Sequence, residues 1–226
     1  MATAYFMQRI IEMTDADRDQ DNIEMIIYNC PTIPDRTGFI LGESSEDPLP
    51  KIIEIANELQ RQNIDYITMP CITAHYFHDQ IADRVFVPVS NGIKEAALYL
   101  SQAGVKKVGI MATDGTARMH LFDSVFKDYD IECVYPSLEC QKLVMSIIYD
   151  DVKAGRPVHM KEFDLVKQQL LEAGAEVVIL GCTELSIVKR DNEVGSKVLD
   201  IIDVLAQDCV KKCATLRPEY NNLITE

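Results

Sequence analysis

A stretch that decides the fold occurs twice in the chain, as L-Q-R-Q-N-I-D-Y-I-T-M-P-C at residues 59–71 and as L-L-E-A-G-A-E-V-V-I-L-G-C at residues 170–182. Each copy has the pattern of a helix end, a tight turn, an apolar strand, a Pro or Gly, and then a cysteine. A threonine follows each cysteine, Thr73 in the first copy and Thr183 in the second. The repeat predicts two similar αβα lobes related by a pseudo-twofold, each with one thiol at the carboxyl end of a strand.

Outside the repeat, apolar runs of strand length alternate with amphipathic stretches of helix length, which is typical of α/β folds with parallel sheets. The predicted strands are Met25–Tyr28, Tyr66–Met69, Phe86–Val89, Lys107–Met111, Ile131–Tyr135, Val177–Leu180 and Lys197–Ile201. Helical periodicity is clearest at 52–59, 92–102, 141–153, 161–173 and 204–214. We expect residues 1–91 and 201–226 to form the first lobe and residues 92–200 the second, with the active site in the cleft between them.

The composition excludes several classes of protein. The 226 residues include 22 Lys and Arg against 36 Asp and Glu, a net charge of −14, which argues against nucleic acid or an anionic membrane as the main partner. The sequence contains no apolar run long enough to span a membrane and no basic-then-apolar leader. The seven cysteines are an odd number, which fits reduced thiols. We therefore expect a cytoplasmic protein whose anionic ligand meets a local basic site.

Two of these cysteines have a distinctive context. Cys71 in M-P-C-I-T-A-H and Cys182 in L-G-C-T-E-L each end a predicted strand and precede a predicted helix, a position that lowers the pKa of a thiol. A free cysteine more often packs as a small hydrophobic residue, but two thiols at matching positions of a repeat favour a shared function. The other cysteines have no such context and are expected to pack in the interior: Cys30, Cys133, Cys140, Cys209 and Cys213.

Two facing thiols suit the inversion of a carbon stereocentre, because that reaction needs a base on one face and an acid on the other. A redox disulfide is the competing use, but the C-x-x-C spacing of thiol oxidoreductases is absent. His75 and His78 have a spacing that could suggest a metal, yet a tetrahedral site needs four well-placed ligands, so we expect no metal. The A-T-D-G-T segment at 112–116 lacks the glycine spacing of a dinucleotide loop, so we expect no cofactor.

These motifs, in this order and nearly throughout the chain, resemble the aspartate/glutamate racemase family. The motifs concerned are I-P-D-R-T, M-P-C-I-T-A-H-Y-F, A-T-D-G-T, I-Y-D-D-V-K-A-G and L-G-C-T-E-L. The resemblance implies two lobes with four-stranded parallel sheets, cofactor-independent racemisation of an amino acid, and a homodimer. It also implies that Cys71 and Cys182 are the catalytic thiols.

The resemblance implies a binding role for six further residues. Four threonines would hold the substrate α-carboxylate: Thr73, Thr113, Thr116 and Thr183. Arg36 and Lys153 would meet the second carboxylate of an acidic substrate, which favours aspartate or glutamate. The alternative, from composition alone, is that Arg36 pairs with Asp35 in a loop and that Lys153 only caps a helix.

Three residues are expected to support the site through hydrogen bonds: His75, Asp114 and Glu184. The alternative for the two acids is compensation of a helix dipole. Two features depart from the family: Ile72 stands where the family has Asn, and the chain starts inside the family's first helix, so that the first strand is expected to be absent. A same-fold isomerase or decarboxylase of a small carboxylic acid and a non-catalytic carboxylate-binding protein are therefore the rival functions.

Overall fold

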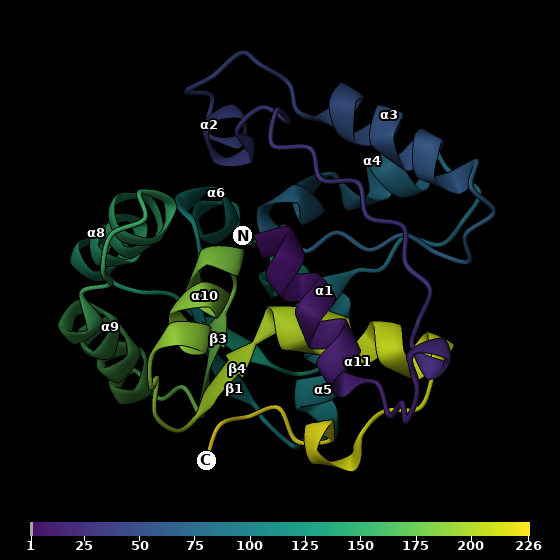
Figure 1. Cartoon of the computed structure of the whole chain (residues 1–226). Helices are drawn as coiled ribbons and strands as arrows, with labels where there is room; N and C mark the ends of the chain where they lie inside the picture. Colours follow the sequence, from purple (N-terminus) through teal and green to yellow (C-terminus); the bar gives the residue numbers. More distant parts are fainter. Residues whose placement is uncertain (1) are drawn as a thin grey trace.

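The computed structural model describes residues 2–226, and its central feature is a four-stranded parallel sheet (Figure 1). The strands lie in the order β2-β1-β3-β4 and comprise β1 (Lys107–Met111), β2 (Glu132–Val134), β3 (Val177–Leu180) and β4 (Val198–Asp200). Every residue of β3 is buried, because helices cover both faces of the sheet. A strand buried on both faces needs a continuous apolar run, which explains the sequence V-V-I-L. The strands predicted in the second lobe are thus confirmed. Strands β2 and β4 are shorter than predicted at both ends.

Helices surround this sheet. They are α5 (Gly92–Gln102), α6 (Asp114–Arg118), α7 (Asp123–Lys127), α8 (Leu138–Ser146), the π-helix η3 (Ile147–Lys153), α9 (Met160–Glu172), α10 (Thr183–Asp191) and α11 (Ile201–Cys213). Helix α9 packs against β1 and β3. The contact is close, because a Cβ on Gly109 of β1 would lie 2.8 Å from the Cβ of Leu170. The helix predicted over 141–153 begins earlier than predicted, within α8, and continues as η3, whose wider turn the hydrophobic pattern did not indicate.

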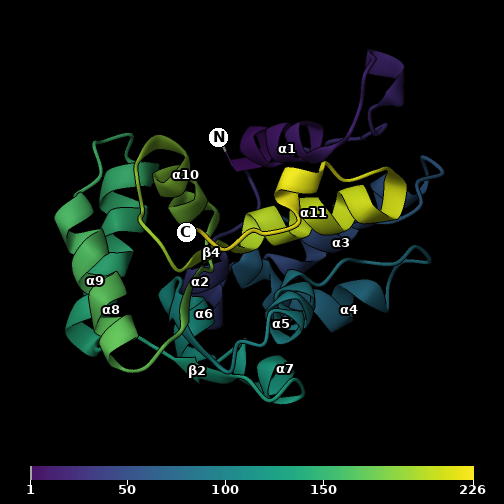
Figure 2. The same ribbon diagram turned by 90° about the horizontal axis from the view of Figure 1, so that it is seen from below.

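The first lobe is built mainly from helices and extended loops. Its helical elements are α1 (Ala2–Met13), η1 (Asp19–Asp21), α2 (Arg36–Ile40), α3 (Leu49–Gln60), η2 (Ile72–Phe77) and α4 (His78–Ala82), and η4 (Pro218–Tyr220) follows α11. Helix α1 runs beside α11 and joins the main apolar core (Figure 2). Helices α3 and α4 enclose a smaller apolar cluster that includes Ile52, Ile67 and Ile81.

Three strand predictions in the first lobe are wrong in this structure. Within residues 2–226, Met25–Tyr28 is extended but pairs with no other strand, whereas Tyr66–Met69 and Phe86–Val89 meet only through a parallel bridge between Ile67 and Val89. The four-stranded sheet implied for this lobe is therefore not formed. The physical reason is the lack of neighbours, because a short parallel strand is held by ladder hydrogen bonds on its two sides. A cavity of about 740 Å³ separates residues 25–28 from residues 66–69.

The structure also bears on one expectation about membranes. None of the helices in the part of the chain that the structure describes combines the length and the apolar character required to cross a bilayer.

Candidate active site

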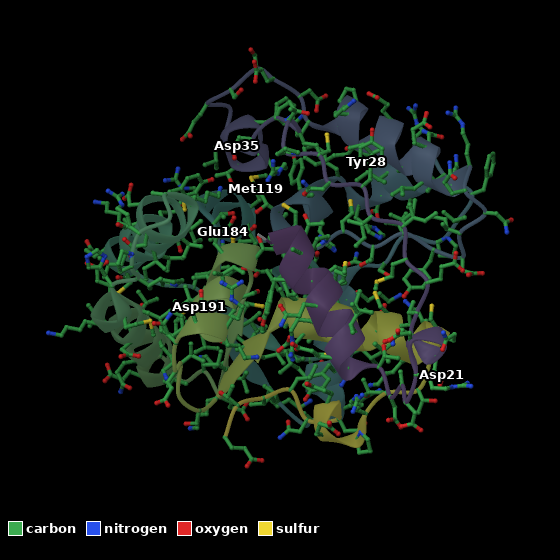
Figure 3. The ribbon with its side chains drawn as sticks, viewed as in Figure 1. Asp21, Tyr28, Asp35, Met119, Glu184 and Asp191 are labelled. Atoms are coloured by element: carbon green, nitrogen blue, oxygen red, sulfur yellow. The ribbon has the colours of Figure 1, made fainter. Side chains whose placement is uncertain are left out.

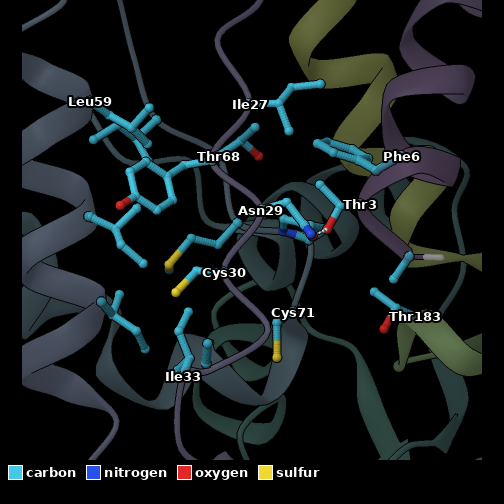
Figure 4. Close-up of a pocket in the computed structure, with 18 of the residues that line it drawn as sticks. Thr3, Phe6, Ile27, Asn29, Cys30, Ile33, Leu59, Thr68, Cys71 and Thr183 are labelled. Carbon is cyan, nitrogen blue, oxygen red and sulfur yellow. Dashed lines mark hydrogen bonds between the residues drawn. The ribbon is translucent and has the colours of Figure 1, made fainter. Parts of the chain in front are cut away.

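The cavity that borders the first lobe extends to the carboxyl end of the sheet in the second lobe, so residues of both lobes line it. Figure 4 shows Cys71 and Thr183 facing this space, with Thr3 and Asn29 hydrogen bonded to each other at 3.1 Å on its wall. Cys182 also lines it. The structure therefore brings the two predicted thiols, one from each copy of the repeat, to one cavity.

Cys182 is held at the start of α10. Gly181 connects it to β3, and a Cβ on that glycine would lie 3.2 Å from the Cβ of Ala112, so the close approach favours glycine. The Cys182 Sγ donates a hydrogen bond to Oε2 of Glu184 at 2.9 Å, and the Thr183 hydroxyl donates to the same oxygen at 3.0 Å. Burial, and then the negative charge of Glu184, raise the pKa of the Cys182 thiol well above its usual value. Cys182 is therefore held as a neutral thiol.

Cys71 lies just before η2 and is only partly buried. Nδ1 of His75 lies 3.1 Å from the Cys71 carbonyl oxygen, and Nε2 of His75 accepts a hydrogen bond from the Gly92 amide at 2.9 Å. The accepting Nε2 assigns the proton to Nδ1, which donates to the carbonyl. Burial lowers the pKa of His75 to about 4, so its ring is neutral at physiological pH. His75 therefore connects the backbone of Cys71 to that of Gly92 through its two ring nitrogens.

A cluster of threonine hydroxyls joins the two lobes beside the thiols. The Thr73 hydroxyl lies 3.0 Å from that of Thr113 and 3.1 Å from that of Thr116, and the last two are 3.3 Å apart. Thr73 and Thr113 line the cavity together with Thr183, whereas Thr116 is fully buried behind them. Thr116 therefore orients its neighbours and does not face the cavity.

Two cations line the same cavity, Arg36 at the start of α2 and Lys153 at the end of η3. Nη1 of Arg36 donates to the carbonyl oxygens of Ile33 and Pro34, at 3.3 Å and 3.1 Å. Nζ of Lys153 lies 3.7 Å from the centre of the Tyr149 ring. Within residues 2–226 neither cation forms a salt bridge, so both charges remain available to an anion in the cavity.

The loop ion pair considered for Asp35 and Arg36 is not formed. Asp35 instead caps α2, because its Oδ2 accepts a hydrogen bond from the Gly38 amide at 2.6 Å. Figure 3 labels Asp35 before α2 and Glu184 at the start of α10, and both residues line the cavity.

Asp114 lies outside the cavity lining. Its Oδ1 accepts a hydrogen bond from Gln141 at 2.9 Å, and its Oδ2 pairs with Arg118 at 3.0 Å. Asp114 thereby connects α6 to α8. Ile72 is only 1% exposed and belongs to the main apolar core, so at this position the site has a packing residue where an amide was expected from the family pattern.

Thr37 and Tyr149 are among the further residues that line the cavity and that the sequence analysis did not name individually. Thr37 directly follows Arg36, and Tyr149 precedes Lys153 by four residues, a spacing that places two side chains on one side of a helix. That spacing was the available signal for Tyr149. Among the described residues no three His, Cys, Asp or Glu side chains are grouped as they would be around a metal ion.

Comparison with known proteins identifies the relatives of this chain. Residues 1–209 match the family model described as Asp/Glu/Hydantoin racemase. The broad specificity amino-acid racemase RacX of Bacillus subtilis (strain 168) is 26% identical over 217 residues, which are 92% of each chain. The solved structure of Picrophilus torridus aspartate racemase is 29% identical, with a TM-score of 0.80 over 97% of this chain and 92% of that chain.

Two more distant structures share the fold. An aspartate racemase homologue from Pyrococcus horikoshii OT3 is 24% identical, with a TM-score of 0.74 over 93% of each chain. Arylmalonate decarboxylase is 14% identical, with a TM-score of 0.50 over 80% of this chain and 84% of that chain.

Proposed function

Because the chain belongs to the Asp/Glu/Hydantoin racemase family, we propose that it racemises an amino acid, with Cys71 and Cys182 as the two proton-transferring groups. The observation that carries the proposal is that both thiols, from matching positions of the internal repeat, line one cavity. Inversion requires a base on one face of the α-carbon and an acid on the other. A thiolate and a thiol from two different lobes meet that requirement.

The reaction proceeds in two proton transfers. A thiolate takes the α-proton, the C–H bond breaks, and its electron pair is delocalised into the α-carboxylate. The opposite thiol then donates its proton to the other face of the carbon, which restores the C–H bond with inverted configuration. The hydroxyls of Thr73, Thr113 and Thr183 donate hydrogen bonds to the carboxylate, whose negative charge grows in the transition state.

Two cations without salt-bridge partners support an acidic amino acid as the substrate. Arg36 and Lys153 line the cavity without salt-bridge partners in the described part of the chain, so a second carboxylate on the substrate finds positive charge there. A guanidinium binds a carboxylate through two parallel hydrogen bonds, and an ammonium adds a mobile point charge. This arrangement supports aspartate, glutamate or a close relative as substrate. The similarity to a broad specificity racemase makes a panel of amino acids the appropriate test.

The location and assembly of the enzyme form a separate part of the proposal. All seven cysteines are unpaired in the structure, which supports a reducing compartment, and we place the enzyme in the cytoplasm. Family resemblance supports a homodimer. Light scattering coupled to gel filtration measures the mass directly, and a mass near the 25.5 kDa of one chain would contradict the dimer.

Proton NMR in deuterium oxide tests the chemistry. The protein is incubated with L-aspartate, L-glutamate and neutral amino acids, and chiral chromatography coupled to mass spectrometry follows both enantiomers. With two separate bases, the D-enantiomer appears already carrying deuterium while the remaining L-enantiomer keeps its proton at early times. A single base that both removes and returns the proton would label the remaining L-enantiomer as well, which would contradict the two-thiol assignment.

Thiol variants complete the test. Cys71→Ala and Cys182→Ala should each abolish formation of the D-enantiomer while the circular dichroism spectrum stays unchanged. Cys133→Ala is the matched control, because that thiol is also partly buried but lies outside the cavity. An active Cys71→Ala variant would overturn the mechanism. Loss of CO₂ from a malonate-type acid by a protein with only one thiol would point to the rival decarboxylase.

A further inference from the structure

Glu184 differs from the other carboxylates of the cavity. Within residues 2–226 four carboxylates line the cavity: Glu24, Asp35, Asp65 and Glu184. The first three are exposed, so water and salt screen their charges. Glu184 is partly buried and lies in the first turn of α10, next to Cys182. It is therefore the acidic group best placed to act on a ligand beside the thiols.

The two oxygens of Glu184 have different surroundings. Oε2 accepts hydrogen bonds from the Cys182 thiol and the Thr183 hydroxyl, at 2.9 Å and 3.0 Å. In the described part of the chain, Oε1 accepts no hydrogen bond and no cation forms a salt bridge with Glu184. An ionised carboxylate can only accept, and its hydrogen bonds to charged donors are the strong ones. Oε1 is therefore a vacant acceptor for a cationic group of a ligand.

The charges beside the thiols match an acidic amino acid. Arg36 and Lys153 supply two cations, and Glu184 supplies one partly buried anion. Aspartate and glutamate carry the complementary set, two carboxylates and one ammonium. A neutral acceptor on the cavity wall, Oδ1 of Asn29, is already occupied by the Thr3 hydroxyl at 3.1 Å. The ammonium group of such a ligand is therefore best served by Glu184.

We propose that Oε1 of Glu184 binds the α-ammonium group of the substrate, so that Glu184 selects amino acids over carboxylic acids without an amino group. This inference rests on the proposed racemase function, because it names the residue that recognises the amino group of that substrate. The two cations meet the side-chain carboxylate and the threonine hydroxyls meet the α-carboxylate. Glu184 then binds the remaining polar substituent of the α-carbon.

Racemisation by two separate groups needs this third contact. When three substituents of the α-carbon are held, the direction of its C–H bond is fixed. If the same three contacts hold both enantiomers, the C–H bonds of the two enantiomers point to opposite sides of the three substituents. Cys71 and Cys182, which come from different lobes, then each meet the C–H bond of one enantiomer. The ammonium keeps its protons throughout, so no covalent bond changes at Glu184.

Binding measured with and without the amino group tests the proposal. Isothermal titration calorimetry gives the Kd of L-aspartate and succinate, and of L-glutamate and glutarate. Each pair differs only in the amino group. Enantiomers have equal enthalpies in water, so their interconversion during the titration adds no heat. We expect the protein to bind each amino acid at least about tenfold more tightly than the matching diacid.

Variants then assign the preference to one oxygen. In Glu184→Gln the amide oxygen can still accept from Cys182 and Thr183, but an NH₂ group replaces Oε1. The Kd of L-aspartate should rise about tenfold, while that of succinate should change by less than about twofold. Glu184→Asp keeps the charge and should restore part of the preference. Glu24→Gln and Asp65→Asn are matched controls, because they remove exposed carboxylates from the same cavity, and both should leave the preference unchanged.

Three outcomes would overturn the inference. The first is an equal change of both Kd values in Glu184→Gln, which would mean that Glu184 only supports the structure. The second is a preference that is lost in Asp65→Asn instead. The third is an unmodified protein that binds succinate as tightly as L-aspartate.

The failure of this inference and that of the proposed function are distinguishable, because the calorimetry does not require turnover. If the Kd values behave as expected but no amino acid is racemised, the proposed function fails and the ammonium site stands. If racemisation occurs and Glu184→Gln leaves the preference for the amino acid unchanged, only the ammonium site fails.

Discussion

The two lobes contain matching copies of one sequence pattern, yet they are held together differently. In the second lobe, β3 hydrogen bonds to β1 on one side and to β4 on the other. In the first lobe, Ile67 occupies the corresponding place, and its amide and carbonyl groups bond only to the segment at Pro88 and Ser90, at 2.9 Å and 2.8 Å. The comparison teaches that an apolar run becomes a strand only where neighbouring strands complete its hydrogen bonds.

The same contrast appears in the apolar cores. The sheet of the second lobe lies within one large cluster, which α1 of the first lobe also joins. The remainder of the first lobe relies on the smaller cluster around Ile52 and Ile81, and it borders the cavity of about 740 Å³. We therefore expect the second lobe to carry most of the stability and the first lobe to open more readily.

The largest expected effect on stability comes from a substitution in the main apolar core, around the sheet of the second lobe. Phe122 is fully buried, with its ring centre 5.4 Å from that of Phe126. Phe122→Ala should lower the free energy of unfolding by about 3–5 kcal/mol, because it leaves a cavity in close-packed surroundings. Phe77→Ala, in the smaller cluster, should cost about 2–3 kcal/mol, since a looser site can collapse around the change. Urea denaturation measures both, and a larger loss for Phe77 would reverse the comparison.

Hydrogen exchange compares the lobes without a mutation. The amides of Ile110 and Val178, within the sheet, should exchange only through global unfolding. The amides of Ile67 and Ser90, at the single bridge, should exchange through local opening at least about 100-fold faster, equivalent to about 2.7 kcal/mol. Equal protection at the four amides, followed by NMR, would mean that the first lobe is as cooperative as the second.

Two helix caps, one in each lobe, should make different contributions to the pH dependence of the free energy of unfolding. Asp200 ends β4 and caps α11, accepting hydrogen bonds from the Ser186 hydroxyl at 2.7 Å and the Ile202 amide at 2.9 Å on one oxygen. Burial, and then the nearby charge of Asp203, raise the pKa of Asp200 to about 7. In the first lobe, the neutral Asn91 caps α5.

The sign of the Asp200 effect follows from proton binding. Between about pH 4 and pH 7 the folded chain keeps a proton on Asp200 that the unfolded chain has lost, so this group's contribution to stability falls as the pH rises, by up to about 1.4 kcal/mol per pH unit. Asp200→Asn should flatten that dependence while keeping both hydrogen bonds. Asn91→Ala should instead cost about 1 kcal/mol at every pH, from the lost cap. Urea unfolding across this range measures both, and an unchanged slope in Asp200→Asn would contradict the assignment.

Surface ion pairs should have the smallest effect on the free energy of unfolding. The size of that effect should be similar in the two lobes. Lys107 joins β1 to Glu132 of β2 at 2.9 Å, and Lys51 pairs with Glu54 within α3 at 2.7 Å. Lys107→Ala and Lys51→Ala should each change the free energy of unfolding by less than about 1 kcal/mol, because solvent screens partly exposed charges. A salt titration of thermal stability checks this, and a large loss for Lys107 would mean that the edge of the sheet depends on that pair.

Much of the second lobe and the core of the site could be predicted from sequence. The strands at 107–111 and 177–180 have the predicted bounds, and the motif cysteines Cys71 and Cys182 do meet at one cavity. Individual orientations could not be predicted, because they depend on what packs behind each side chain. Thr116 carries the same hydroxyl as Thr113 in one short motif, yet it is fully buried while Thr113 lines the cavity.

The sequence by itself determined the α/β class, the internal repeat and the pair of thiols, since these depend on local patterns of apolar, turn-forming and reactive residues. Only the tertiary structure decided that residues 25–28 stay unpaired, that η3 places Lys153 over Tyr149, and that Glu184 accepts the hydrogen bond of Cys182. Strand pairing and electrostatic partnership join residues far apart along the chain, and their energies depend on distances that exist only after folding.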